Sequence, residues 1–492
     1  MRRGVSDSDL PRKSMENHRS RGDSFKTYPA ARPTPRPAGK GSAMPGYPYS
    51  SYPLDFRVND HRAEPGERLA ALREAARGGV KTGEVNNHIH TIYSFSPYTP
   101  SMAALLAENA GLEAAGSVDH DSVGAAEEML AACAALDIGG CCGFEVRVSF
   151  RSGPFRDRKI NNPDSEGIAY MTVQGIPEPA LPGARDFLAP LRSARLLRTY
   201  AMTARLNDLL ADAGFPASER IDAEEDVLGH SQYAAGGGVT ERHLLAAAAR
   251  LFIRRRGKGP QVPQDLKTKF GFSLPAAIEK NLSDPANPHY LFDLVGALKT
   301  TLLPAVFIQP EETECVPART VTDFARAIGA VPAYAYLGDV GESPTGDKAA
   351  ERFEDSYLDE LFAELSGLGY CAVTYMPPRN SLEQLRRVRR LCAEKGFMEI
   401  SGVDINSSRQ SFSCPEVLRP DFRHLVDTTW ALVAHERLAS LDSDLALFSP
   451  ENPLRSEPLS RRLSVYAALG RELDRARPRE SALSLAKKLQ KG

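Results

Sequence analysis

The strongest constraint on the fold is an alternation of strand and helix patterns between residues 84 and 150. Strands are predicted at 85–90, 115–119 and 142–148, with an amphipathic helix in each interval. The first helix has a clear start, since Thr99 can act as its N-cap and Pro100 occupies its first position. Strands joined through helices run parallel and bring their carboxyl ends to one edge, where ligands bind. The chain is therefore predicted to be α/β, with its functional residues at the strand ends.

Each of these three strands ends in side chains that can bind a metal. They are His88 and His90 in the first, Asp119 and His120 in the second, and Glu145 in the third. Side chains alternate along a strand, so the two histidines of the first strand point the same way, with Cα atoms ~6–7 Å apart. Both imidazoles can then reach one ion. Each pair alone is weak, because a histidine on a strand or an Asp-His turn before a helix is common in proteins without metal. The order of all five over two strand–helix units predicts a metal site.

This order, HxH, then DH, then a glutamate, resembles the opening motifs of the PHP (polymerase and histidinol phosphatase) family of metal-dependent phosphoesterases. Downstream, Asp404-Ile405-Asn406 matches the closing D-x-H motif of the family except at its last residue. The resemblance covers about residues 84–180 and 330–435. It implies an α/β fold, a distorted (β/α)7 PHP-type barrel similar to a TIM barrel, with further strands at 168–174, 331–337, 371–376 and 399–404.

The resemblance also implies a set of metal ligands. His88, His90, Glu145 and Asp404 would hold one ion well, and His120 with Asn406 would contribute to a second, weaker position. Two imidazoles and two carboxylates suit zinc, manganese or iron.

The chain departs from the family pattern at three positions. Gln174 and Tyr336 stand where relatives carry metal-binding histidines, and Asn406 replaces the closing histidine. An amide oxygen is a poorer ligand than an imidazole. We therefore expect one divalent ion, with a second at most, instead of a fuller three-metal site.

Three arginines follow predicted strand ends: Arg147, Arg379 and Arg409. A guanidinium binds phosphate oxygens in pairs, so these residues are predicted to bind a phosphorylated substrate, together with Lys348 in a loop rich in Gly and Asp. The predicted catalytic residues are Asp119, His120, Arg379 and Arg409. Taken alone, each arginine fits a surface ion pair better than a phosphate ligand.

Composition divides the chain into five segments. Residues 1–55 are rich in Arg, Ser, Pro and Gly and are expected to remain disordered as a basic tail. The barrel is expected at 81–178 and again at 323–440, where strand and helix patterns alternate. Between them, 179–322 has helical spacing and is predicted to be a mostly helical insertion. A C-terminal helical tail is expected at 441–492.

The net charge of −2 gives no general attraction to nucleic acid or to an anionic membrane. No apolar run approaches the ~20 residues that span a bilayer. The seven cysteines include no CxxC pair, and the N-terminal residues lack the apolar segment of a signal peptide. The expected location is the cytoplasm, the expected partner a small phosphorylated molecule, and the sequence leaves the oligomeric state open.

Two functions of different classes follow. In the first, the protein is a metal-dependent phosphoesterase that hydrolyses a phosphate ester with a metal-activated water. In the second, the altered positions leave a catalytically degenerate module that binds metal or phosphate without turnover. An exonuclease-like role is disfavoured by the balanced charge and by the lack of a basic stripe.

Overall fold

The computed structural model describes residues 56–76, 78–339 and 352–490. The predicted basic tail at 1–55 and the predicted substrate ligand Lys348 lie outside the described residues. The described chain begins with a short helical turn at Phe56–Asn59 and helix α1 (Pro65–Ala75). These lead into the first strand of the sheet.

One seven-stranded sheet has its strands in the order of the chain, as the sequence predicts. Its strands are β1 (Glu84–Ile89), β2 (Leu112–His120), β3 (Gly139–Ser149), β4 (Ile168–Gln174), β5 (Val331–Ala335), β6 (Ala372–Tyr375) and β7 (Met398–Ser401). Helices between and after the strands are α2 (Pro100–Asn109), α3 (Ala126–Ala135), α10 (Ala318–Ala327), α11 (Leu358–Leu368), α12 (Leu382–Lys395) and α13 (His424–Ala439). The chain then continues through α14 (Leu459–Glu472) and α15 (Pro478–Leu489).

The sheet is a nearly closed barrel. A parallel bridge joins Ile89 to Ile405, just beyond β7, and the Asn86 side chain donates a hydrogen bond to the Val403 carbonyl at 2.8 Å. These contacts bring the two edges of the sheet together, so β1 lies beside the segment that carries Asp404.

The expectation that all strands run parallel is wrong for β4. It pairs antiparallel with both β3 and β5, while the other neighbouring strands pair in parallel. The link from β3 to β4 is a loop with no crossover helix, and a crossover is what parallel pairing requires. The carboxyl end of β4 therefore lies at the opposite end of the barrel from those of its neighbours.

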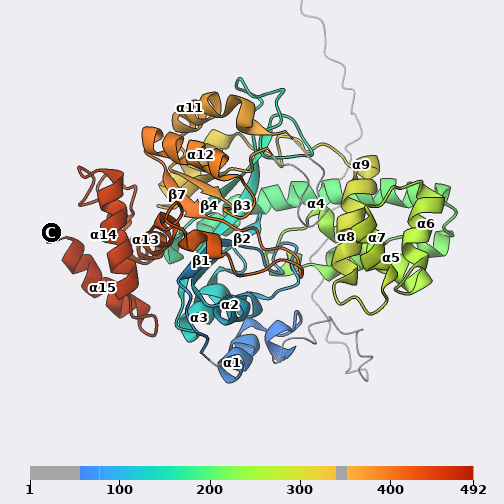
Figure 1. The fold of residues 1–492 in the computed structure, drawn as a ribbon, viewed down its shortest axis with the longest axis horizontal. Helices are drawn as coiled ribbons and strands as arrows, with labels where there is room; N and C mark the ends of the chain where they lie inside the picture. Colours follow the sequence, from blue (N-terminus) through green and yellow to red (C-terminus); the bar gives the residue numbers. More distant parts are fainter. Residues whose placement is uncertain (1–55, 77, 340–351, 491–492) are drawn as a thin grey trace, which may run out of the picture. The chain divides into compact units, whose positions relative to one another are not determined.

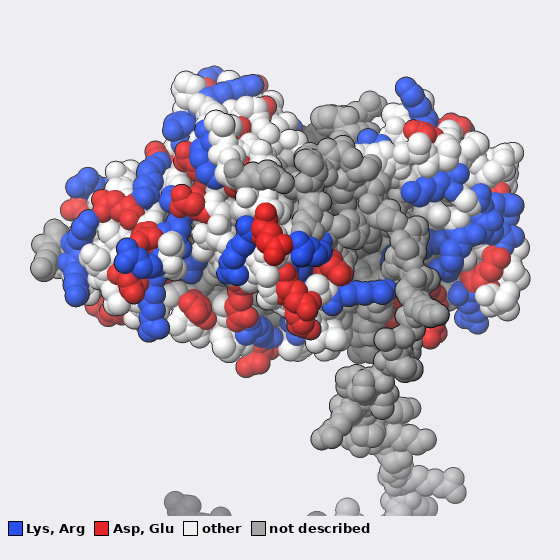
Figure 2. Space-filling model, turned by 90° about the horizontal axis from the view of Figure 1, so that it is seen from below, with Lys and Arg blue, Asp and Glu red and all other residues white. Residues whose placement is uncertain are grey.

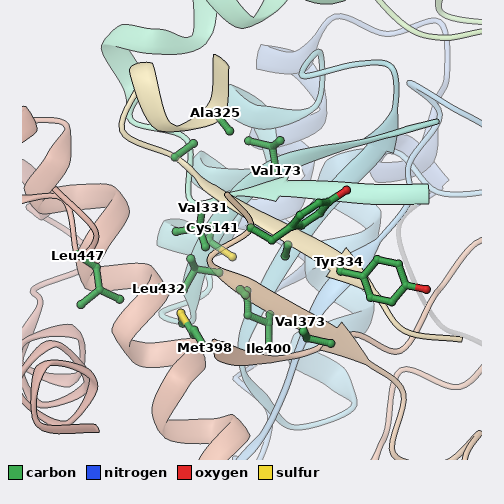
Figure 3. Packing of buried hydrophobic residues seen from close by; sticks show 14 of the residues in the cluster. Cys141, Val173, Ala325, Val331, Tyr334, Val373, Met398, Ile400, Leu432 and Leu447 are labelled. Carbon is green, nitrogen blue, oxygen red and sulfur yellow. The ribbon is translucent and has the colours of Figure 1, made fainter. Parts of the chain in front are cut away.

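Helix α13 packs against the end of the barrel where β4 finishes. The Gly175 carbonyl lies 3.1 Å from His435 Nε2, and Glu436 accepts a hydrogen bond from the Cys142 amide at 2.7 Å. A Cβ at Gly139 would come within 2.9 Å of the Trp430 ring, so only glycine fits where β3 begins. Figure 3 shows strand side chains of the barrel core beside Leu432 of this helix. This end is filled, which leaves the opposite end for a site.

Local sequence signals predicted several helix boundaries correctly. The Thr99 side chain accepts a hydrogen bond from the Met102 amide and caps α2, with Pro100 at its first position. A capping box between Ser381 and Gln384 opens α12, and Gly396 ends it in the left-handed conformation. Each device satisfies backbone groups that the helix leaves unpaired, so it works without help from distant residues.

The insertion is helical, as predicted. It comprises α4 (Leu181–Asp212), α5 (Glu241–Arg256), α6 (Gln261–Phe270), α7 (Ala276–Ser283), α8 (Tyr290–Thr301) and the short α9 (Leu303–Val306), with several single turns. Helix α4 joins two cores, because Leu188 packs in the barrel core and Leu206 in the core of the insertion. Figure 1 shows α4 running from the barrel into the group of helices α5 to α8.

None of the helices in the described part of the chain is long and apolar enough to cross a bilayer. Charged side chains of both signs are mixed over the face shown in Figure 2. The basic run at the end of α5 has acidic partners: Arg255 pairs with Glu219, and Arg256 pairs with Asp265 at 2.6 Å.

Candidate metal centre

The two histidines of the HxH motif are positioned by β1 and by the closure of the barrel. The Ile405 amide donates to the His88 carbonyl at 3.0 Å, and the His90 amide donates to the Ile405 carbonyl at 2.9 Å. This ladder holds the backbone on both sides of Ile89, and both imidazoles are buried. Their ring centroids lie 5.1 Å apart.

Register between β2 and β3 brings the next two candidates together. His120 and Glu145 are direct partners in the parallel ladder. His120 Nδ1 lies 3.1 Å from Glu145 Oε2. The same carboxylate lies 3.6 Å from His88 Nε2 through Oε1 and 3.6 Å from His90 Nε2 through Oε2. Glu145 is thus the centre of the cluster, in agreement with the predicted ligand set.

The closing motif reaches the same cluster. Asp404 Oδ1 lies 3.4 Å from His90 Nε2. The Asn406 amide donates to the same Oδ1 at 2.6 Å, so it supports the carboxylate. Sequence reasoning therefore identified Asp404 and Asn406 as parts of the site, while their roles as ligands stay predictions.

The separations within the cluster fit a shared ion better than hydrogen bonds. Ligand atoms about 2.1 Å from a tetrahedral ion lie roughly 3.4 Å from one another. His88, His90 and Glu145 offer ligand atoms all within 4.8 Å of one another. Within the described residues, His90 Nε2 and His120 Nδ1 are buried and lack a hydrogen-bond partner. Buried polar atoms are normally paired, so these nitrogens indicate a missing ligand. The residues present can hold a metal ion.

Electrostatics keep two of the three imidazoles in the metal-binding form. Burial lowers the pKa of His90. Burial, followed by nearby positive groups that include Arg195 and Arg147, takes the pKa of His120 well below its ordinary value. At His88, burial opposes protonation, but the carboxylates of Glu145 and Asp404 outweigh it and raise the pKa. A neutral imidazole is the form that binds a metal.

Asp119 stands behind the cluster. Its carboxylate accepts hydrogen bonds from the Thr91 amide and hydroxyl, both at 2.6 Å, and from the Ser94 hydroxyl at 2.7 Å. Ser94 Oγ also lies 3.3 Å from Nδ1 of His90. Asp119 is therefore linked to His90 through Ser94, the arrangement by which outer carboxylates orient metal-binding histidines. Its predicted catalytic role stays a prediction.

Two members of the cluster are partly exposed. The His88, His90 and Glu145 side chains are at most 8% exposed, whereas the side chains of His120 and Asp404 are 22% and 32% exposed. Solvent or substrate reaches the cluster past these two residues.

Arg147 lies on β3 two residues beyond Glu145, and its guanidinium is already paired. It donates to Glu241 at 2.7 Å and to Glu314 at 3.2 Å. Further buried partners join the same carboxylates, and we call this group the buried ion-pair network. The network consists of Arg147, Arg195, Arg198, Asp121, Glu241 and Glu314.

The other two predicted phosphate ligands have partners of different kinds. Arg409 forms a two-pronged ion pair with Asp293 of α8, so it links the loop after β7 to the insertion. Arg379 Nε donates to the Leu337 carbonyl at 3.2 Å. Their predicted contacts with substrate stay predictions.

The two positions expected to have lost imidazoles face different surroundings. Because β4 runs antiparallel, Gln174 pairs with Gly143 and Val331 toward the filled end of the barrel, and its amide donates to Thr172 at 3.1 Å. At the open end, β4 instead places Tyr170 beside His120, with ring centroids 5.6 Å apart. The Tyr336 hydroxyl donates to Asp355 at 2.7 Å.

Sequence reasoning missed three polar residues around the cluster. Thr91 and Ser94 directly follow the HxH motif, so hydroxyl residues there were an available signal. Arg242 comes from the start of α5 in the insertion, and its Nη1 donates to Asn406 Oδ1 at 2.6 Å. Nothing in the sequence near residue 242 indicates proximity to a motif at 404–406.

Comparison with known proteins shows no close relative. No family model matches the chain. No curated protein matches it. Two solved structures resemble it distantly, each with a TM-score of 0.43. One is described as a candidate metal-dependent phosphoesterase from Bifidobacterium adolescentis, 17% identical, with 66% of this chain and 88% of that chain covered. The other is an amidohydrolase from Chromobacterium violaceum with bound sulfate and no metal, 18% identical, with 69% and 95% covered.

Proposed function

We propose that this protein is a metal-dependent phosphoesterase that hydrolyses a small phosphorylated molecule. The observation that carries the proposal is the buried group of His88, His90 and Glu145, in which the His90 Nε2 nitrogen has no hydrogen-bond partner among the described residues. The order of these motifs along the chain, with its resemblance to the PHP family, supports phosphate-ester chemistry. Zinc, manganese or iron suits the ligand types, with one ion held well.

When bound, a divalent ion polarises a phosphoryl oxygen and lowers the pKa of a water molecule so that hydroxide is available near neutral pH. The chain supplies the orientation. Asp119 and Ser94 fix the His90 ring, and Asn406 fixes the Asp404 carboxylate. A site held in this way needs little reorganisation during reaction.

The open side determines which residues the substrate meets. His120 and Asp404 are the exposed members of the cluster, so an ester approaches across them. His120 is neutral at neutral pH and can accept a proton there if no ion binds its Nδ1. Arg379 and Arg409 remain proposed ligands of the substrate phosphate. For Arg409, that role requires exchange of Asp293 for phosphate.

The experiment is metal analysis of protein purified without added metal, followed by a screen of phosphomonoesters and phosphodiesters. We expect His88→Ala to remove most bound metal and to lower kcat/KM by about a thousandfold, because a bound ion lowers the activation free energy by several kcal/mol. Ser193→Ala, on the exposed part of α4, is the matched control and should leave the metal content and kcat/KM unchanged.

Two outcomes would contradict the proposal. Protein that binds metal through His88 and hydrolyses no ester in a broad screen would favour the degenerate binding module. Hydrolysis that persists in His88→Ala would assign the activity to another site or to a contaminant.

A further inference from the structure

The start of helix α5 brings the insertion to the metal cluster. Thr240 is its N-cap, and the first two helical residues, Glu241 and Arg242, have separate partners. Glu241 joins the buried ion-pair network, where it accepts from Arg147 at 2.7 Å and from Arg198 at 2.6 Å. This pairing anchors the helix start, so the position of Arg242 is set by its buried neighbour.

Arg242 is connected to the candidate ligands by a short chain of contacts. Its Nη1 donates to Asn406 Oδ1 at 2.6 Å, and Asn406 Nδ2 donates to Asp404 Oδ1 at 2.6 Å. Asp404 in turn lies 3.4 Å from His90 Nε2. Asp404 is also one of the two partly exposed members of the cluster, with 32% of its side chain exposed. The guanidinium therefore stands at the entrance to the cluster.

Arg242 differs from the arginines of the buried ion-pair network and from Arg409 in that no ion pair with an acidic residue is found for it among the described residues. Arg147, Arg195 and Arg198 are neutralised within the buried network, and Arg409 is paired with Asp293. No Asp or Glu of the described residues forms an ion pair with Arg242, and Asn406 is a neutral partner. Arg242 also lies at a helix N-terminus, where the helix dipole disfavours a positive charge. A half-buried, uncompensated guanidinium at that place is suited to an anion from outside.

We propose that Arg242 binds the phosphoryl oxygens of the substrate, so that the helical insertion contributes a specificity-determining residue to the barrel site. This inference rests on the proposed function for its substrate class. It explains why the insertion is fixed to the open side of the barrel by buried ion pairs. It also transfers the main phosphate contact from the residues that follow barrel strands to a residue of the insertion. Folding brings this residue into contact with Asn406, 164 positions away in the chain.

The test measures binding of inorganic phosphate by calorimetry on metal-loaded protein, together with metal content and KM for an ester that the protein hydrolyses. Arg242→Gln should weaken phosphate binding about ten- to a hundredfold, the usual contribution of a charged hydrogen bond, and leave metal content unchanged. Arg242→Lys keeps the charge but not the planar fork, so its affinity for phosphate should lie between those of the wild type and Arg242→Gln. KM should rise more than kcat falls. Arg254→Gln, on an exposed position of the same helix, is the matched control and should change nothing.

The outcomes separate this inference from the proposed function. Phosphate binding that depends on Arg242 in a protein without any esterase activity would support the inference and reject the phosphoesterase. Turnover with unchanged phosphate affinity in Arg242→Gln would overturn the inference alone. Loss of metal with unchanged phosphate affinity after metal is restored would also overturn it, because Arg242 would then act only by supporting Asn406 and Asp404.

Discussion

Two buried charged clusters lie side by side in this protein, and they differ in how their charges are compensated. In the buried ion-pair network three arginines face three carboxylates, and each member has an oppositely charged partner within 3.2 Å. In the metal cluster, two carboxylates face imidazoles at 3.1 to 3.6 Å, and two ring nitrogens lack hydrogen-bond partners. Both clusters use residues of β3, Arg147 in the first and Glu145 in the second.

The difference separates a cluster that is compensated by protein groups from one that could hold a metal ion. A buried charge is tolerated when it is paired, and the network meets that condition from protein groups alone. The metal cluster meets it less fully, because among the described residues His90 Nε2 and His120 Nδ1 are buried without a hydrogen-bond partner. Position on a strand does not distinguish the two, since Arg147 and Glu145 are neighbours on one face of β3.

Removal of a carboxylate from the network is expected to have the largest effect on stability. Glu314→Gln leaves three buried arginines with two carboxylates, and we expect a loss of about 3–5 kcal/mol in the free energy of unfolding. Urea denaturation of metal-free protein measures it. Glu360→Gln, which breaks the exposed pair with Arg158, is the control and should cost less than about 1 kcal/mol.

A nearly unchanged free energy of unfolding in Glu314→Gln would contradict the structural role of the buried ion-pair network. Loss of metal from folded Glu314→Gln protein would contradict the separation of the two clusters, because the network would then belong to the binding site.

A smaller effect is expected from the Ser94 hydroxyl, which links Asp119 to His90. Ser94→Ala removes the contact between Asp119 and His90, and we expect metal affinity to fall about ten- to a hundredfold. Metal competition with a chelating dye measures the dissociation constant. Unchanged affinity in Ser94→Ala would show that packing alone orients the His90 ring.

The smallest effect concerns the protonation of a histidine that lies outside both clusters. Burial lowers the pKa of His435 to about 4, and its Nδ1 accepts a hydrogen bond from the Leu447 amide at 2.9 Å. The unfolded chain binds a proton near pH 6.5 and the folded chain does not, so stability falls as the pH drops from 6.5 toward 4. Between pH 7 and 5.5 the loss from this residue is about 1 kcal/mol.

Urea denaturation at the two pH values tests this, with His435→Gln as the comparison protein. The variant should lose about 1 kcal/mol less than the wild type over the same pH interval. An identical loss in both proteins would exclude His435 as a source of acid sensitivity.

The sequence by itself determined the strand positions, several helix caps and the core of the metal cluster. These depend on short-range order: side-chain alternation along β1 and the cap at Thr99. The tertiary structure decided the reversed direction of β4, which moves Gln174 toward the filled end of the barrel. It also decided that Arg147 is neutralised by Glu241 and Glu314 while Arg242 meets Asn406. Partners of this kind are separated by up to 167 residues along the chain, and no local pattern encodes which charges will meet when the insertion packs on the barrel.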